Sequence, residues 1–399
     1  MNAMLERMIK KVLCHSLLLM AVASLPVQAL IIPPADNHQV INLSYDKSAP
    51  PADSYIWNRA SGGTDDSTIG SSWDWRNGAW QCLSATDTTN GACTPVGTWA
   101  WDEGPVPSAL TLRFTEKRSH MSVDIKLLGF NESQSPATDC WAAGYSAPRA
   151  FWSGGYYGRW CDDGHKKPIT AGLALTLWLP QAELAKIPTG GSWQAKLVLS
   201  QQDWVMDVGP IHKVATFSAD ITLNVTDKNN GAIYLPAFGS ATPRVDLNLR
   251  TQPLSTAPGG EVSGQSNIDM CLYDGYNSNS PWLKVTLADQ QSVAGRAADV
   301  FSVSRDGSSA TATADRIDYR VTLNYNNQPQ KVNNGQAITL TGVNTALIRP
   351  VVLPGIPFPV VCTPAPLTLD VLPFAKLSKA AGHFTGTLRV TLSADALAP

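Results

Sequence analysis

Alternation of apolar and polar residues recurs along this whole chain, and it limits the fold more than any other feature of the sequence. A two-residue period places every second side chain on one face of a β-strand. Repeated this often, it favours antiparallel sheets with one buried face. The alternating segments are SALTLRF at 108–114, LALTLWL at 173–179, AKLVLS at 195–200, DITLNV at 220–225, RVDLNL at 244–249, IDYRVTLNY at 317–325 and FTGTLRVTL at 384–392.

Turn signals separate these segments. Asn-Gly and Asp-Gly dipeptides favour the two-residue type I′ turns of β-hairpins. They begin at residues 77, 90, 163, 230, 274, 306 and 334. A helical pattern is confined to LPQAELAKIP at 179–188, where Pro180 suits the first helical turn. We therefore predict an all-β protein.

The amino terminus resembles a secretory signal. A basic patch at residues 7–11 precedes an apolar run at residues 12–23, and Ala29 offers a small residue for cleavage. The apolar run is too short to span a bilayer, which takes roughly 20 residues. We expect residues 1–29 to be a signal peptide and the mature chain to begin at Leu30.

Charge argues against a polyanionic partner. Residues 1–29 contain three of the 30 basic and one of the 32 acidic residues, so 27 basic and 31 acidic residues remain, a net charge of −4. Nucleic-acid binders show a strongly basic face or tail. We therefore expect no nucleic-acid partner.

Six cysteines remain after the signal peptide, and an even number in a secreted chain indicates disulfides. None of them has CxxC spacing, which disfavours a zinc site or a redox dithiol. Six cysteines allow many pairings. Of these we choose the sequential one: Cys82–Cys93, Cys140–Cys161 and Cys271–Cys362.

Composition divides the chain into two parts. Twelve of the 13 tryptophans lie between residues 57 and 204. The polar, turn-forming stretch at 224–231 follows an alternating segment and is a natural junction. We expect one domain at 30–227 and a second at 228–399.

The stretch SSWDWRNGAWQC, residues 71–82, combines three tryptophans, an arginine and a cysteine. A turn at Asn77-Gly78 would divide its side chains between two faces: Trp73, Trp75, Trp80 and Cys82 on one, and Asp74, Arg76, Ala79 and Gln81 on the other. Aromatic cross-strand pairs stabilise such ribbons, so we predict that the tryptophans are core residues. Arg76 is then either a solvated charge or a ligand contact.

Catalytic motifs are absent from the sequence. No segment matches GxSxG, HExxH, a P-loop or GxGxxG. CDDGHKK at 161–167 could suggest a metal or acid/base cluster, but its residues are equally ordinary turn residues beside a disulfide. We expect no cofactor, no metal site and no enzymatic activity.

Several stretches together resemble the minor tip adhesins of class 5 fimbriae, the colonization-factor group assembled by the alternate chaperone pathway and also called CblD-like. The resemblance covers nearly all of the mature chain, with the six cysteines in matching places. The stretches are LRFTEKRS (112–119), TTNGAC (88–93), LNVTDK (223–228), RVDLNLR (244–250), NIDMCLYDGYNSNS (267–280) and NGQAI (334–338).

This resemblance implies two immunoglobulin-like β-sandwich domains, an adhesin domain followed by a pilin domain. The pilin sandwich is expected to be incomplete, and to be completed by a periplasmic chaperone and then by the amino-terminal strand of the next subunit. An inserted strand takes affinity from main-chain bonds and specificity from side-chain pockets. The alternative is an ordinary edge strand. The residues expected to line the groove are Phe384, Leu388, Val390 and Leu392.

The resemblance also implies that the adhesin domain binds carbohydrate, typically sialylated host glycoconjugates, through exposed arginines. Arg76 matches one of these with a one-residue offset, and a guanidinium suits a sialyl carboxylate. Further arginines are expected in a loop after a GG-x-W motif, here GGSW at 190–193. The aligned loop, SQQDWVMD, has Asp203 and Trp204 in their places, so receptor specificity is expected to depart from the family pattern.

The segment GGYYGRWC at 154–161 lies near the family's binding surface and adds two candidates, Tyr157 and Arg159. Arg159 could supply the charge that is missing at Asp203. The alternative is a glycine-flanked loop whose aromatic residues pack under the disulfide.

The sequence therefore suggests a fimbrial tip adhesin, secreted through the periplasm to the cell surface. The expected partners are a periplasmic chaperone, an outer-membrane usher, a major pilin subunit and a host glycoconjugate. An alternative is an assembly initiator that starts fibre growth at the usher and has little adhesive activity. A secreted carbohydrate-active enzyme is a third and weaker hypothesis.

Overall fold

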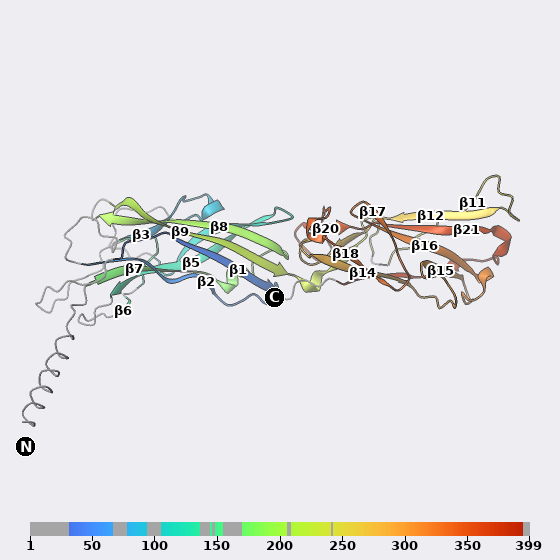
Figure 1. The fold of residues 1–399 in the computed structure, drawn as a ribbon, viewed down its shortest axis with the longest axis horizontal. Coiled ribbons are helices and arrows are strands. Elements are labelled where there is room, and N and C mark those ends of the chain that lie inside the picture. Colours follow the sequence, from blue (N-terminus) through green and yellow to red (C-terminus); the bar gives the residue numbers. More distant parts are fainter. Residues whose placement is uncertain are drawn as a thin grey trace, which may run out of the picture.

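The protein, seen in a computed structural model, consists of two β-rich domains arranged end to end (Figure 1). Signal residues 1–29, the Cys140–Cys161 pair, Arg76, Tyr157 and Arg159 lie outside the described residues. Within those residues, no helix has the length and apolar character needed to cross a membrane. The structure describes residues 32–66, 78–93, 105–135, 144–145, 148–154, 170–205, 209–240 and 242–393.

A single sheet builds the first domain, in the order β1-β9-β8-β4-β5-β7-β2, with β3 beside β8 and β6 beside β5. Strand β1 runs parallel to β9, and the other neighbours are antiparallel. The strands are β1 (Asn37–Asp46), β2 (Ser54–Asp66), β3 (Ala79–Cys82), β4 (Ser108–Glu116), β5 (Ser122–Ser135), β6 (Gly144–Tyr145), β7 (Thr170–Leu179), β8 (Gly191–Val205) and β9 (Gly209–Thr226). The predicted helix is the single turn α2 (Gln181–Leu184), and η2 (Thr88–Asn90) is a 3₁₀ turn.

This sheet folds over itself into two layers, with β8 and β9 in one and β5 and β7 in the other (Figure 1). Phe217 lies in the core between them, with ring centroids 5.5 Å from Trp57 and 5.4 Å from Trp80. Both contacts are edge-to-face, the geometry that aromatic quadrupoles favour. Trp80 is completely buried, which confirms its prediction as a core residue.

The predicted polar face of the 71–82 ribbon is wrong for Ala79, which is also completely buried. The reason is that β3 pairs with β8, opposing Ala79 to Gln202 and Cys82 to Leu199. Gln81 is half-buried. The other half of the predicted hairpin, including Trp73 and Trp75, lies outside the described residues.

Three sheets build the second domain, in the orders β10-β13-β20-β19, β11-β12-β21-β16-β15-β22 with β17 beside β16, and β18-β14-β23. Short 3₁₀ turns lie at Lys228–Asn230, Thr313–Asp315, Val343–Thr345 and Lys376–Ser378. The strands are β10 (Ala232–Tyr234), β11 (Arg250–Thr251), β12 (Glu261–Ile268), β13 (Cys271–Tyr273), β14 (Trp282–Asp289), β15 (Val300–Arg305), β16 (Arg316–Tyr325), β17 (Gln328–Lys331), β18 (Ala337–Thr341), β19 (Arg349–Val351), β20 (Val360–Pro364), β21 (Leu367–Ala375), β22 (Phe384–Thr385) and β23 (Leu388–Ser393).

Two strand predictions need correction in this domain. Residues 244–249 alternate between exposed and half-buried as an extended segment does, but they form no strand before β11. The segment predicted at 384–392 is divided into β22, which pairs with β15, and β23, which pairs with β14. The chain therefore moves from one sheet to another between Thr385 and Leu388.

The turn prediction is also wrong in detail. Of the Asn-Gly and Asp-Gly dipeptides that lie wholly within the described residues, none directly joins two paired strands. The two-residue hairpin between β16 and β17 is made by Asn326-Asn327, with φ of 50° and 61°. Asparagine tolerates the left-handed region that both positions of a type I′ turn require.

Candidate receptor-binding and subunit-joining surfaces

The predicted loop around Asp203 and Trp204 is instead the end of strand β8, which continues to Val205. Strand β9 opposes it, pairing Trp204 with Pro210. The Asp203 side chain is 1% exposed, and its carboxylate accepts a hydrogen bond of 2.7 Å from the His212 amide. The assignment of Asp203 as a receptor contact is therefore wrong, since its carboxylate points into the protein rather than toward a ligand.

Two of the three predicted disulfides are present within the described residues. Cys82–Cys93 closes a short loop with a sequence separation of 11 in the first domain. Cys271–Cys362 joins β13 to β20 in the second domain with a separation of 91. Both confirm the sequential pairing that we chose.

Strand β23 is an open edge of the second domain. Its Leu388, Val390 and Leu392 pack on the core but remain half-buried. On one side β23 pairs with β14, whose Val285 and Leu287 are completely buried. In the part of the chain that the structure describes, no strand pairs with the other side of β23.

A second half-buried apolar segment belongs to the same core. Val245 and Leu247 pack against it from the extended segment before β11. Phe384, the remaining residue of the predicted groove, lies on β22 and is also half-buried. The half-buried apolar residues of this domain thus concentrate near its beginning and its end.

The domain junction is held by buried hydrogen bonds rather than by an apolar patch. Glu116, at the end of β4, is completely buried. Its carboxylate accepts hydrogen bonds from the Ser119 amide at 2.6 Å, the Ser192 amide at 3.1 Å and, across the junction, Asn279 Nδ2 at 2.8 Å. Donors that surround a buried carboxylate compensate the loss of its hydration.

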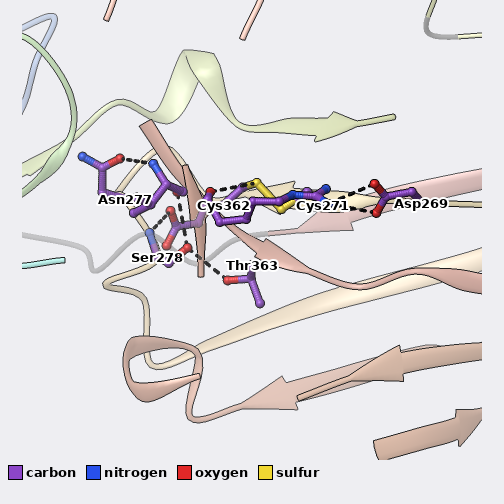
Figure 2. The surroundings of a disulfide bond; sticks show 9 residues. Asp269, Cys271, Asn277, Ser278, Cys362 and Thr363 are labelled. Carbon is purple, nitrogen blue, oxygen red and sulfur yellow. Dashed lines mark hydrogen bonds and ion pairs between the residues drawn. A yellow bond between two sulfur atoms is a disulfide. The ribbon is translucent and has the colours of Figure 1, made fainter. Parts of the chain in front are cut away.

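The motif DGYNSNS supplies the other half of this junction. Asn277 Nδ2 donates to Gly190 O at 2.8 Å in the first domain, while its Oδ1 accepts from the Val361 amide at 3.0 Å. Figure 2 shows Asn277 and Ser278 beside the Cys271–Cys362 disulfide, which holds this part of the second domain together. Asn277 therefore links a disulfide-braced segment of one domain to the backbone of the other.

Two further contacts cross the junction. Tyr276 Oη donates to Asn224 Oδ1 at 2.9 Å, and burial raises the pKa of this phenol to about 12, so it remains a neutral donor. Arg118 Nη2 donates to Ala346 O at 2.7 Å. Sequence analysis missed the role of these residues, although the unusual polar run after Cys271 was a signal that could have indicated it.

Comparison with known proteins agrees with this two-domain architecture. The family model of the first domain of CfaE, a CFA/I fimbrial subunit, matches residues 26–228, and the model of its second domain matches residues 231–396. The curated CFA/I fimbrial protein of this name from Escherichia coli is 30% identical over 318 residues, which are 78% of this chain and 79% of that protein.

Solved structures show the same similarity. The crystal structure of CfaE, the adhesive subunit of CFA/I fimbria of enterotoxigenic Escherichia coli, superposes with a TM-score of 0.71 at 25% identity, covering 90% of this chain and 93% of that one. A chaperone–tip adhesin complex of CFA/I fimbriae matches with a TM-score of 0.62 at 24% identity, covering 92% and 98%. Because both domains and their order match, the chain belongs to the CfaE family of class 5 fimbrial tip adhesins.

Proposed function

We propose that this protein attaches a fimbria to host-cell carbohydrate and that its second domain joins it to the fibre by accepting a donor strand. In this proposal residues 30–227 form the receptor-binding domain and residues 228–399 the pilin domain. The observation that carries it is the half-buried row Leu388, Val390 and Leu392 on an open edge. A row of this kind gains hydrogen bonds and apolar contacts when an extended segment is added beside it.

The open edge also suggests the order of partners. A periplasmic chaperone would cover β23 first, since an unpaired apolar edge is an aggregation hazard. The major pilin subunit would later replace it at the outer-membrane usher. The solved relative described as a chaperone–tip adhesin complex supports this sequence of partners. The protein would then reach the cell surface at the fimbrial tip.

For the receptor surface we propose Arg76, Tyr157, Arg159 and Trp204. Arg76 and Arg159 would contact an acidic sugar through their forked donors, and the aromatic rings would stack on sugar faces. Asp203 is not part of this surface, because its carboxylate is buried. The proposed activity is binding without chemical change of the glycan.

Glycan-array binding of the mature chain tests the receptor proposal. The protein is produced in the periplasm with its chaperone, so that disulfides form, and is compared with Arg76→Ala. We expect binding to acidic glycans that falls at least tenfold in the variant. Binding retained by Arg76→Ala but lost on Tyr157→Ala would move the site to the aromatic segment, and a folded protein that binds no glycan would contradict the proposal.

The second candidate function is an assembly initiator with little adhesion. It is favoured by Asp203 and Trp204, which stand where the family pattern has arginines. Deleting residues 30–227 in the bacterium distinguishes the two candidates. An adhesin predicts that fibres still assemble but that bacteria no longer attach to host cells, whereas an initiator predicts attachment that is unchanged per fibre.

A further inference from the structure

The outer face of the first domain carries a groove of about 690 Å³ that none of the predicted receptor residues lines. Its floor is formed by β4, β8 and β9, and turn η2 overhangs one side. A volume of this size is typical of small-ligand sites. The lining residues are Thr89, Asn90, Arg113, Thr115, Gln194, Ala195, Lys196, Asp220, Ile221 and Thr222.

The overhanging wall is fixed before any ligand arrives. Asp87 caps η2 by accepting from the Thr89 amide at 3.0 Å, and Thr88 Oγ1 donates to Asp124 Oδ1 on β5 at 3.1 Å. The Cys82–Cys93 disulfide closes the loop that carries this turn. The amide and carbonyl of Ala92 bond those of Thr111 on β4, each at 2.8 Å. A preformed wall lowers the ordering cost of binding.

The floor presents polar side chains in register. Strand pairing opposes Lys196 to Asp220 and Gln194 to Thr222 across β8 and β9, and opposes Thr115 to Gln194 across β4 and β8. Within the described residues, the side-chain ends of Asn90, Gln194 and Lys196 make no hydrogen bond or ion pair. Two amides and an ammonium are thus free to bind a ligand.

The charges favour a hydroxyl-rich ligand over a simple anion. Arg113 is already paired with Asp124, through Nε at 3.0 Å and Nη2 at 3.2 Å, and hydrogen bonding from Arg113 holds the pKa of Asp124 below its usual range. Asp220 adds a negative charge to the lining. One unpaired ammonium beside a carboxylate, amides and hydroxyls suits a sugar, whose hydroxyls donate and accept hydrogen bonds alike.

We propose that this groove binds a short oligosaccharide and is a second carbohydrate site on the receptor-binding domain. The inference rests on the proposed function, that this domain recognises host glycans. The groove lies apart from the proposed receptor surface, because Lys196 and Trp204 are eight residues apart on one strand, or about 26 Å at the rise of a β-strand. No aromatic residue lines the groove, so binding at one site is weak and gains strength from many fimbriae.

Methyl NMR of the full mature chain, labelled at threonine methyl groups, tests this proposal. The probes are lactose, N-acetyllactosamine and their 3′- and 6′-sialylated forms. We expect concentration-dependent shifts at Thr115 and Thr222 in the groove, with Thr251 on β11 unchanged. The variant Gln194→Ala/Lys196→Ala should weaken this binding at least tenfold. Lys213→Ala, an exposed lysine of β9 outside the groove, should leave it unchanged.

Arg76→Ala separates the groove from the proposed receptor surface. Groove shifts that persist in Arg76→Ala and disappear in the double variant support the groove, whatever becomes of the receptor proposal. Glycan binding that Arg76→Ala abolishes while the Thr115 and Thr222 signals never move overturns the groove and leaves the proposed function intact. Saturating probe with no shift at either threonine, in a folded protein, also overturns the groove.

Discussion

The half-buried apolar residues are distributed differently in the two domains. In the first domain they are dispersed over several elements, among them Ile41, Val123 and Trp152. In the second they gather in two segments, Ile233 to Leu247 near its beginning and Phe384 to Leu392 near its end. Both domains have completely buried central strands, so the difference lies at the margin of the core.

That difference teaches where each domain obtains its stability. Dispersed partial exposure is normal for a soluble domain, because there is not enough polar surface to cover it. Aligned partial exposure along one edge marks a missing neighbour. The first domain completes its own sandwich, whereas the second leaves the place of one strand open beside β23.

Adding the missing strand should produce the largest effect. A carboxy-terminal extension with alternating apolar residues, linked so that it reaches β23, should raise the free energy of unfolding of the second domain by about 5 kcal/mol, since fully burying one aliphatic side chain yields about 1.5–3 kcal/mol. The first domain should not change. Chemical denaturation with separate fluorescence and circular dichroism signals measures both transitions.

The matched control for this experiment is an extension with serine at the apolar positions. It keeps the linker and the length but offers no side chains for the core. Equal stabilisation by both extensions would show that β23 needs only a main-chain partner. No stabilisation by either would contradict the open-edge interpretation.

Disulfide removal should sharpen the comparison next. The bond in the second domain closes a separation of 91 residues and that in the first only 11. Loop-closure entropy then predicts losses of about 4.7 kcal/mol for Cys271→Ser/Cys362→Ser and about 3 kcal/mol for Cys82→Ser/Cys93→Ser. Denaturant midpoints at constant slope measure both, and an equal loss would argue against the entropic account.

Equivalent ion pairs should also differ between the domains. The side chains of Arg296 and Asp289 are 12% and 2% exposed, whereas those of Arg113 and Asp124 are 46% and 41% exposed. Asp289→Ala should cost about 3–5 kcal/mol by leaving a buried charge unpaired. Asp124→Ala should change stability little, because exposed pairs contribute little. Thermal unfolding of both variants measures the contrast, and similar losses would contradict it.

Acid should distinguish the second domain through the same pair. Burial opposes ionisation of Asp289, but hydrogen bonds from Arg296 and the Ser302 amide outweigh it and lower its pKa. A lowered pKa in the folded state adds stability that is complete above the unfolded pKa, and that is lost as pH falls below about 4 through the folded pKa. Unfolding followed from pH 6 to pH 2 should show this loss in the wild type and not in Asp289→Asn.

The smallest expected effect lies at the junction between the domains. A Cβ at Gly190 would overlap the carbonyl oxygen of Gly275, and backbone cannot move aside as a flexible side chain can. We expect Gly190→Ala to cost about 2 kcal/mol, a typical cost of local backbone strain. Gly239→Ala is the control, because nothing lies within 4 Å of a Cβ there. Protease cleavage near residues 227–231 should increase in Gly190→Ala alone.

Strand periodicity was the most reliable guide to the fold. Segments such as 108–114 and 317–325 became β4 and β16 with nearly the expected bounds. Their alternation reflects burial of one face, which the residues themselves encode. The cysteine spacing and the even cysteine count were similarly informative, since Cys82–Cys93 and Cys271–Cys362 both formed.

Strand ends and turns were less predictable, because partners far along the chain decide them. Residues 201–205 read as a polar loop, yet β9 pairs with them and extends β8 to Val205. That pairing directs Asp203 inward. Conversely, residues 244–249 have strand-like alternation but no ladder partner among the described residues.

The sequence by itself determined the all-β class, the disulfide pairs that are described, the buried tryptophan Trp80 and the apolar row that ends the chain, because each depends on residue type and short spacing. Only the tertiary structure decided the groove at Gln194 and Lys196 and the junction at Glu116 and Asn277. These sites join residues that are many positions apart, such as Glu116 and Asn279. Polar side chains of this kind look like ordinary surface residues until the fold brings their partners within hydrogen-bonding distance.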